Sequence, residues 1–241
     1  MIVIAVCGGT GSGKSYLSKK IINQFNKYKV EYLCLDSYYK NYKDLSFAER
    51  CEINFDHPNS IDFELFYQHL KSLIDGNEIY CPVYSYKSHK RLSKNKKINV
   101  CDILIVDGIY ILLKKNIRKL FDLSIFLDVE YGIRLDRRIN RDISERSRTK
   151  NEVVNRFEKM IIPMHKKFVE KTKDYADLKI KENYSFKSIS AKIEKLINNN
   201  SNLFNNFSSK KFIIFFEGWE KRKYIDYDIC GKSRFNGNIA I

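Results

Sequence analysis

The sequence predicts an α/β fold in which a five-stranded parallel sheet is flanked by helices. Short, continuous apolar runs are typical of strands buried on both faces of such a sheet, and helical patterns alternate with them along the chain. The strands are expected at residues 2–7, 32–35, 103–107, 123–128 and 176–180. The helices are expected at residues 14–28, 60–75, 134–148 and 186–197.

Two local signals refine this outline. Ser60 is a favourable N-cap residue, and the helix that it would start ends just before Gly76. The apolar face of this helix is expected to contain Phe63, Phe66, Tyr67, Leu70 and Ile74. The tyrosine-rich stretch 79–86 alternates roughly in polarity, which predicts a small β-hairpin element within residues 78–100.

Length and charge limit the domain organisation and the partners. The 241 residues suffice for one sizeable α/β domain with an appendage. An Asn-rich stretch after residue 197 separates a domain at 1–198 from a tail of unknown role at 199–241, in which 212–216 is β-like. The formal charge of +15 is compatible with nucleic acid or polyanionic small molecules, but it also reflects a general abundance of Lys.

Cysteine spacing and hydropathy exclude several classes of protein. The six cysteines contain no CxxC pair, which excludes a zinc or redox site of that type. No stretch approaches the roughly 18 apolar residues that a membrane span needs, and the first apolar run is too short for a signal peptide. We therefore expect a cytoplasmic protein in a reducing compartment, with no membrane partner.

A glycine-rich phosphate-binding loop follows the first predicted strand. Residues 8–15 read GGTGSGKS and satisfy the pattern G-x-x-x-x-G-K-[ST]. Glycines let the backbone aim successive N–H groups at phosphate oxygens, Lys14 reaches the β- and γ-phosphates, and Ser15 offers a hydroxyl to Mg²⁺. The loop predicts ATP and Mg²⁺ as ligands, with contacts from Gly8, Thr10, Gly11, Ser12, Gly13, Lys14, Ser15 and Tyr16.

Two carboxylates end predicted strands and therefore lie where open α/β sheets bind ligands. Asp107 closes the strand at 103–107 and is expected beside Ser15 as a metal ligand. Asp36 ends the second strand, where it would either accept the proton of an attacking hydroxyl or serve as an ordinary turn residue. Its position alone leaves both interpretations open.

The predicted helix at 134–148 is rich in arginine. Its arginines are Arg134, Arg137, Arg138, Arg141, Arg146 and Arg148. Three of them share one face: Arg134, Arg138 and Arg141. Another face is expected to anchor the helix to the core through Leu135, Ile139 and Ile143. The use of Arg in a lysine-rich chain suggests bidentate phosphate recognition. We interpret the segment as a lid that closes positive charge over the γ-phosphate, and an RNA-binding patch is the alternative.

Together these motifs resemble the uridine kinase (uridine–cytidine kinase) family. Besides the phosphate loop, the resemblance is carried by DSYY at 36–39, NFDHP at 54–58, PVYSYKSH at 82–89 and RRINRDISER at 137–146. These blocks occur in the family's order. The resemblance implies a P-loop kinase fold, transfer of the γ-phosphoryl group of ATP to the 5′-hydroxyl of uridine or cytidine, and a homotetramer.

The resemblance also implies roles for individual residues. Asp36 would be the catalytic base and lie near the metal with Ser15 and Asp107, while Lys14 and Arg138 would also take part in catalysis. Further contacts to the ATP phosphates would come from Arg141 and Arg146. The nucleoside would be bound by Tyr39, Phe55, Asp56, Tyr84, His89, Arg138, Arg148 and Arg156. In that set Asp56 would hold the ribose hydroxyls. The pyrimidine would be surrounded by Phe55, Tyr84 and His89, with Arg148 reaching it from the lid.

Two residues depart from the usual pattern of the family, because Asp107 stands where Glu is usual and Arg156 where Gln is usual. The nearer alternative function is that of a sister kinase acting on another alcohol, such as phosphoribulose or pantothenate. The alternative from another class is an RNA-dependent P-loop ATPase. We expect no nucleic-acid partner, because no aromatic-plus-basic RNA motif stands in the sequence.

Overall fold

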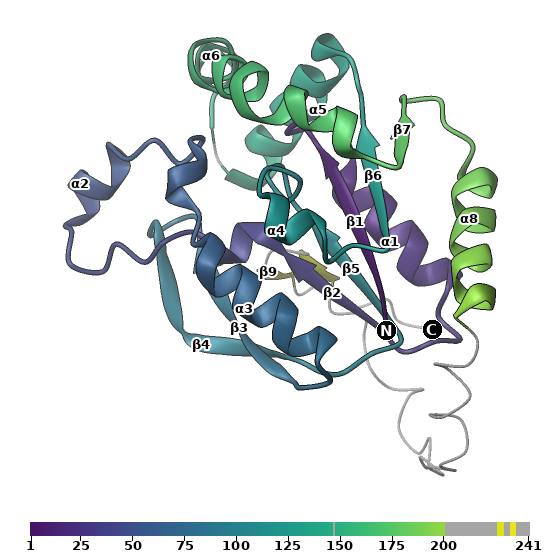
Figure 1. The fold of residues 1–241 in the computed structure, drawn as a ribbon. Helices are drawn as coiled ribbons and strands as arrows, with labels where there is room; N and C mark the ends of the chain where they lie inside the picture. Colours follow the sequence, from purple (N-terminus) through teal and green to yellow (C-terminus); the bar gives the residue numbers. More distant parts are fainter. Residues whose placement is uncertain (147, 201–225, 229–231, 235–241) are drawn as a thin grey trace, which may run out of the picture.

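The computed structural model describes residues 1–146, 148–200, 226–228 and 232–234 (Figure 1). The side chains of Glu145 and Arg146 and the β-like run expected at 212–216 lie outside the described part of the chain. Two short strands of the tail, β8 (Asp226–Asp228) and β9 (Lys232–Arg234), pair antiparallel.

The core of the structure is the five-stranded parallel sheet that the apolar runs predict. In spatial order its strands are β2 (Val30–Cys34), β5 (Ile103–Asp107), β1 (Ile2–Gly8), β6 (Leu123–Leu127) and β7 (Leu178–Ile180). Every residue of β1, β5 and β6 is buried, as is typical of strands covered on both faces. The sheet is therefore enclosed at its centre, and its strand ends are the places left for a site.

Helices lie on both sides of the sheet (Figure 1). The strand side chains alternate between two apolar layers that cover its faces. One layer contains α1 (Lys14–Gln24) and α8 (Phe186–Asn199), which pack against Ile2, Ile4 and Val6 of β1. The other contains α3 (Phe63–Ile74), which packs on the side of Val3 and Ala5. Because successive side chains of β1 point to opposite faces of the sheet, this one strand contributes side chains to both layers.

The start of α3 differs from the expectation. Ser60 is wrong as its N-cap, because its hydroxyl donates to the carbonyls of Phe55 (3.1 Å) and His57 (2.7 Å) within a preceding turn. The N-cap is Asp62, whose carboxylate accepts from the Leu65 amide at 3.1 Å. Asp62 lies two residues further along the chain than Ser60. Its carboxylate can therefore accept a hydrogen bond from a backbone N–H of the first turn, which has no partner within the helix.

The predicted hairpin is confirmed as β3 (Ile79–Ser85) and β4 (Lys90–Ile98), a two-stranded antiparallel sheet. β4 is the outer strand and is exposed along most of its length. Arg91 ties it to the segment that follows β2 and to the start of α3, because its Nε donates to the Tyr39 carbonyl at 2.8 Å and its Nη2 to the N-cap Asp62 at 3.0 Å. The hairpin is thereby fixed beside the carboxyl ends of the strands.

The remaining helical elements connect these layers. The α-helices are α2 (Phe47–Cys51), α4 (Lys115–Arg118), α5 (Tyr131–Arg146), α6 (Lys150–Arg156) and α7 (Ile162–Met164). The 3₁₀-helices are η1 (Leu35–Tyr38), η2 (Pro58–Ser60) and η5 (Glu170–Tyr175). The π-helices are η3 (Phe157–Ile161) and η4 (His165–Val169). Of the helices within the described ranges, none combines the length and apolar character that crossing a membrane requires.

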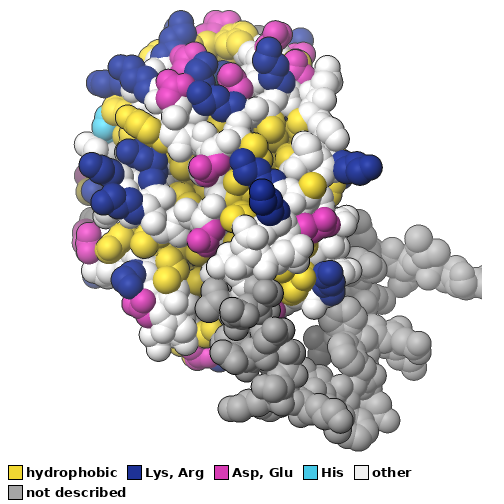
Figure 2. All heavy atoms as spheres, turned by 45° about the vertical axis from the view of Figure 1, so that its right-hand side comes forward, with side chains coloured by type: hydrophobic (Ala, Val, Ile, Leu, Met, Phe, Trp, Pro, Cys, Tyr) yellow, Lys and Arg dark blue, Asp and Glu magenta, His cyan; other side chains and the backbone are white. Residues whose placement is uncertain are grey.

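Basic side chains do not form a separate layer on the face of the molecule seen in Figure 2. Lys and Arg are interspersed there with Asp and Glu. On this face the positive formal charge of +15 agrees with a general abundance of Lys rather than with a continuous stripe for a polyanion.

We expect a chain that ends at Asn200 to fold as the full chain does, because α8 completes its layer through Ile189, Ile193 and Ile197. Thermal unfolding followed by circular dichroism should remain cooperative, with a Tm shift of no more than about 4 °C, which corresponds to ~1 kcal/mol.

The matched control is a chain that ends at Ser185 and so lacks α8. It loses three buried isoleucines, each contributing roughly 1.5–3 kcal/mol, and should not show a cooperative transition. If the chain ending at Asn200 behaves like this control, residues beyond 200 belong to the main core.

Candidate functional site

The glycine-rich loop joins β1 to α1 at the carboxyl end of the sheet. Gly11 (φ +75°) and Gly13 (φ +95°) have left-handed backbone conformations that other residues rarely adopt. A Cβ on Gly11 would lie 2.3 Å from the Arg134 carbonyl oxygen, so the lid helix approaches the loop backbone directly. Lys14 begins α1, and its Nζ donates to the Gly9 carbonyl at 3.1 Å across the loop.

The two acidic candidates lie together because β2 and β5 are neighbours, with Cys34 opposite Asp107. Asp107 is buried, and its Oδ2 accepts from Ser15 Oγ at 3.2 Å. Burial raises the pKa of Asp107 to about 6; the Lys14 charge opposes this shift and the Asp36 charge adds to it. Asp36 follows β2, and its Oδ2 accepts from the Tyr86 hydroxyl of the hairpin at 3.2 Å.

The helix α5 buries Arg134 and Arg138, whereas Ile143 is 46% exposed, so the expectation that Ile143 anchors the helix to the core is wrong. Leu135 and Ile139 are half-buried, and their part in such an anchor stays a prediction. Each buried guanidinium has a partner: Arg138 Nη1 donates to Thr10 Oγ1 at 2.8 Å, and Arg134 Nη1 lies 3.5 Å from His165 Nδ1. These contacts offset part of the cost of burying the two charges, although Arg134 Nε is buried without a hydrogen-bond partner among the described residues.

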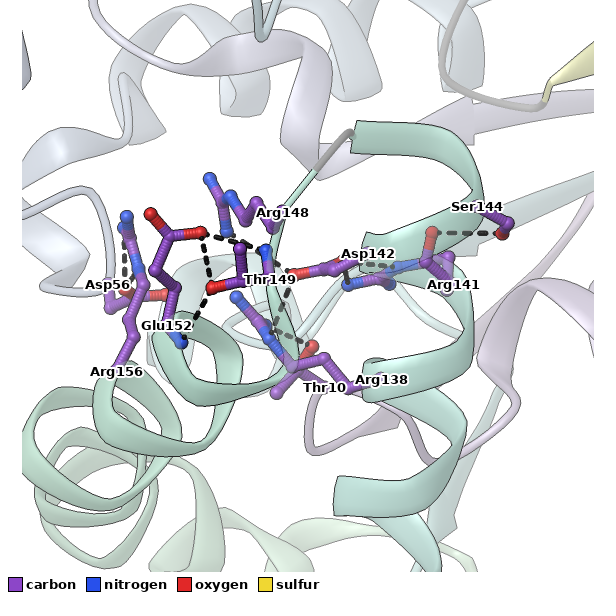
Figure 3. A network of polar contacts seen from close by, with 10 residues as sticks. All are labelled: Thr10, Asp56, Arg138, Arg141, Asp142, Ser144, Arg148, Thr149, Glu152 and Arg156. Atoms are coloured by element: carbon purple, nitrogen blue, oxygen red, sulfur yellow. Dashed lines mark hydrogen bonds and ion pairs between the residues drawn. The ribbon is translucent and has the colours of Figure 1, made fainter.

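A buried carboxylate holds several lid arginines (Figure 3). Asp142 is 0% exposed and lies 3.3 Å from Arg138 Nε. It also accepts from Arg141 at 3.0 and 2.9 Å and from Arg148 at 3.3 Å. Arg146 ends the same helix, but its side chain lies outside the described part of the chain, so the contact expected from it stays a prediction.

Aromatic rings form one wall of the site. Phe55 stacks on His89 with ring centroids 5.0 Å apart, and Tyr39 contacts Phe55 at 5.6 Å and Tyr84 at 5.0 Å. The hydroxyl of Tyr84 is buried and has no hydrogen-bond partner within the described residues. Burial and the charges of Arg156 and Arg148 lower the pKa of His89. The wall therefore offers flat apolar surface with a neutral imidazole and one buried hydroxyl.

A carboxylate–guanidinium pair lies next to the aromatic wall, because Asp56 follows Phe55 in the chain and Arg156 is near enough to His89 to lower its pKa. Arg156, the last residue of α6, donates from Nε (3.2 Å) and Nη2 (3.0 Å) to Oδ2 of Asp56. The Tyr110 hydroxyl donates to the backbone carbonyl of Asp56, which fixes the loop that carries it. The pair joins the lid segment to the loop between α2 and α3 (Figure 3).

Most of the predicted site residues line one cavity of about 390 Å³. The predicted residues that it brings together are Thr10, Gly11, Gly13, Lys14, Ser15, Tyr16, Asp36, Tyr39, Phe55, Asp56, Tyr84, His89, Asp107, Arg138, Arg141, Arg148 and Arg156. Gly8 and Ser12 belong to the loop but do not line the cavity.

Several residues that line the cavity have no individual role predicted from the sequence. The additional lining residues are Lys19, Cys34, Tyr86, Ile109 and Arg137. Tyr86 and Arg137 stand inside the motifs at 82–89 and 137–146, and Arg137 donates to the Ser12 carbonyl at 3.2 Å. The motif at 137–146 also contains Asp142. No local signal singles out Cys34 or Ile109.

The chemistry of the cavity divides into two ends. The glycine-rich loop and the lid arginines make one end suited to a polyanion. The aromatic wall and the Asp56–Arg156 pair make the other suited to a flat ring that carries hydroxyl groups. Asp36 and Asp107 also line this cavity; Asp107 is the last residue of β5, and Asp36 lies just after β2.

Comparison with known proteins gives one consistent family. Residues 3–189 match the Phosphoribulokinase / Uridine kinase family. The chain is 42% identical over 181 residues to a uridine kinase of Clostridium botulinum (strain Kyoto), with 75% of this chain and 88% of the relative covered. A uridine kinase of Halalkalibacterium halodurans is also 42% identical, with 75% and 86% covered.

Solved structures show the same fold at low sequence identity. Phosphoribulokinase from Rhodobacter spheroides is similar with a TM-score of 0.55 and 12% identity, covering 75% of this chain and 69% of that one. D-glycerate 3-kinase from Cryptococcus neoformans is similar with a TM-score of 0.53 and 15% identity, covering 69% and 78%.

We expect His89 to titrate below 6.5, because burial and nearby guanidinium charges disfavour the imidazolium. Arg156→Gln removes one of these charges and should raise the pKa of His89 toward 6.5. The measurement is a pH titration of the histidine resonances by NMR, with His89→Gln used to identify the signal. Lys90→Gln, which removes an exposed charge from the same hairpin, is the control and should leave the pKa unchanged. An unchanged value in Arg156→Gln would show that Arg156 does not face His89 in solution.

Proposed function

The chain belongs to the phosphoribulokinase/uridine kinase family, and from that premise we propose that it transfers the γ-phosphoryl group of ATP to the 5′-hydroxyl of uridine and of cytidine. The observation that carries the proposal is the single cavity in which a phosphate-binding loop meets an aromatic wall and two carboxylates. A nucleoside and a nucleotide need these two ends in one space, because the reacting atoms must lie in contact.

At the phosphate end, Lys14, Arg138 and Arg141 supply positive charge to ATP. Phosphoryl transfer leaves little covalent work for a protein, so rate enhancement comes from positioning and from charge stabilisation at the transferring group. Arg138 donates to Thr10 of the loop, which favours a role next to the phosphates. Arg146 is proposed for the same end from its place in the motif.

Ser15 and Asp107 would hold Mg²⁺, with Asp36 nearby. Their oxygens already share a hydrogen bond of 3.2 Å, and hydroxyl and carboxylate oxygens suit this ion. Across the described ranges no cluster of three or more His, Cys, Asp or Glu forms a ready metal cage. That finding agrees with Mg²⁺ bound through few protein ligands plus water and phosphate oxygens. When bound, the ion neutralises charge on the phosphates.

Asp36 is proposed as the general base for the 5′-hydroxyl. Its Oδ2 accepts from the Tyr86 hydroxyl at 3.2 Å, which restricts the orientation of the carboxylate. The other oxygen, Oδ1, is then assigned to the proton of the attacking hydroxyl. Loss of that proton makes the 5′-oxygen a better nucleophile as the phosphoryl group transfers.

The nucleoside occupies the other end. Phe55, Tyr84 and His89 surround the pyrimidine, with Arg148 reaching it from the lid, and Tyr39 helps to place the sugar. Asp56 binds the ribose hydroxyls as an acceptor. Because Arg156 donates from both Nε and Nη2 to Oδ2 of Asp56, Oδ1 is assigned to the sugar. We also propose that residues 1–198 carry the activity, that the enzyme is a homo-oligomer, and that no nucleic acid takes part.

The test is ADP release with uridine, cytidine, pantothenate, ribulose phosphate or RNA added singly. A neutral His and a Tyr hydroxyl can each donate or accept, so kcat/KM for uridine and cytidine should agree within about tenfold, or ~1.4 kcal/mol. Lys14→Ala should abolish transfer to either nucleoside. Stimulation by another acceptor, with none by the nucleosides, would assign the chain to that acceptor instead.

Asp36→Asn keeps the shape of the side chain but cannot take the proton. We expect kcat for uridine to fall roughly 10²–10⁴-fold, while the KM for ATP changes much less. Steady-state kinetics measure both quantities. Asp44→Asn, which removes an exposed carboxylate from the same stretch of chain, is the control and should remain active. An unchanged kcat in Asp36→Asn would return Asp36 to the role of a turn residue.

A further inference from the structure

Asp142 does not line the cavity, but it contacts three arginines that do (Figure 3). Its carboxylate is 0% exposed. Oδ1 accepts from Arg141 Nε at 3.0 Å and Nη2 at 2.9 Å, and Oδ2 lies 3.3 Å from both Arg138 Nε and Arg148 Nη1. One buried carboxylate thus shares its two oxygens among guanidiniums from three positions of the chain.

The three arginines differ in what they reach beyond Asp142. Arg138 continues to the phosphate loop through Thr10 Oγ1 at 2.8 Å. Arg148 follows the lid helix, and its backbone N–H also donates to the Asp142 carbonyl at 3.2 Å. Arg141 keeps 35% of its side chain exposed. Asp142 therefore joins the phosphate loop, the lid and the segment that leads to α6.

A buried carboxylate is costly unless charged partners compensate for it. Arginine side chains are also long and flexible, so an unanchored guanidinium must be ordered before it can meet a phosphate. Asp142 carries one negative charge and does not by itself neutralise three guanidiniums. It can hold them in place and still leave positive charge directed at the cavity.

We propose that Asp142 is a positioning residue that holds three arginines of the site in one arrangement. Arg138 and Arg141 then meet the transferring phosphoryl group already oriented, and Arg148 is kept at the nucleoside end. This role rests on the proposed function. Preorganised charge acts most strongly in the transition state. Loss of Asp142 should therefore lower kcat more than it weakens the binding of ATP.

The first experiment compares Asp142→Asn with Asp136→Asn, which removes an exposed carboxylate from the same helix. In Asp142→Asn we expect kcat for uridine phosphorylation to fall about 10–100-fold, the size of effect that a misplacement of about 1 Å produces. The KM for ATP should change much less, and Asp142→Glu should recover part of kcat. Asp136→Asn should behave as the wild type. Equal kcat in Asp142→Asn and Asp136→Asn would overturn the proposal.

A double-mutant cycle separates positioning from a general loss of stability. If Asp142 acts through Arg141, Asp142→Asn should cost much less in kcat when Arg141 is already Ala. Additive losses would overturn the proposal. Should Asp142→Asn lack a cooperative thermal transition, the same cycle is measured with Asp142→Glu and Arg141→Lys, which keep every charge.

An error in the proposed function can be distinguished from an error in the positioning role of Asp142. A wild-type protein that hydrolyses ATP but does not phosphorylate uridine would contradict the acceptor alone. The cycle would then be measured on ATP hydrolysis, where coupling between Asp142 and Arg141 supports the positioning role and additivity overturns it.

Discussion

The parallel register of β1, β5 and β2 is the constraint on which the site depends. Asp107 lies between Val6 and Cys34 in the sheet, so the glycine-rich loop, Asp107 and Asp36 all emerge at one edge. Side chains alternate between the two faces of a strand, so a slip of one residue in β5 would turn Asp107 to the opposite face. The hydrogen bond between Asp107 and Ser15 would then be lost, although every strand remained.

The site also depends on the helix α5, which buries charged side chains against the glycine-rich loop. α5 packs against the loop through Arg134 and Arg138 rather than through an apolar stripe. Thr10 and Asp142 supply the compensating oxygens for Arg138. A helix held in this way is attached by interactions that water and anions can also make. An apolar stripe would hold the lid without placing any charge at the phosphates.

Local patterns predicted the strands, the hairpin, the glycine-rich loop and the carboxylates at the strand ends, whereas the residues at the nucleoside end of the cavity were implied by the family resemblance. A glycine-rich loop restricts the backbone, and a buried strand end restricts where an acid can lie. The failures concern tertiary partners. Ser60 has the right chemistry for a cap, yet Asp62 caps α3 because Ser60 hydrogen-bonds within the preceding turn. Tyr86 contacts Asp36, which is 50 residues away in the sequence, and the role of Asp142 depends on its burial. Periodicity encodes neither.

The outer strand of the hairpin has a consequence for behaviour in concentrated solution. β4 exposes a row of backbone groups that could pair with the same strand of another copy. Its sequence, KRLSKNKKI, places several lysines along that edge, and like charges on two approaching edges repel each other. This repulsion opposes the pairing of β4 with an edge strand of another copy.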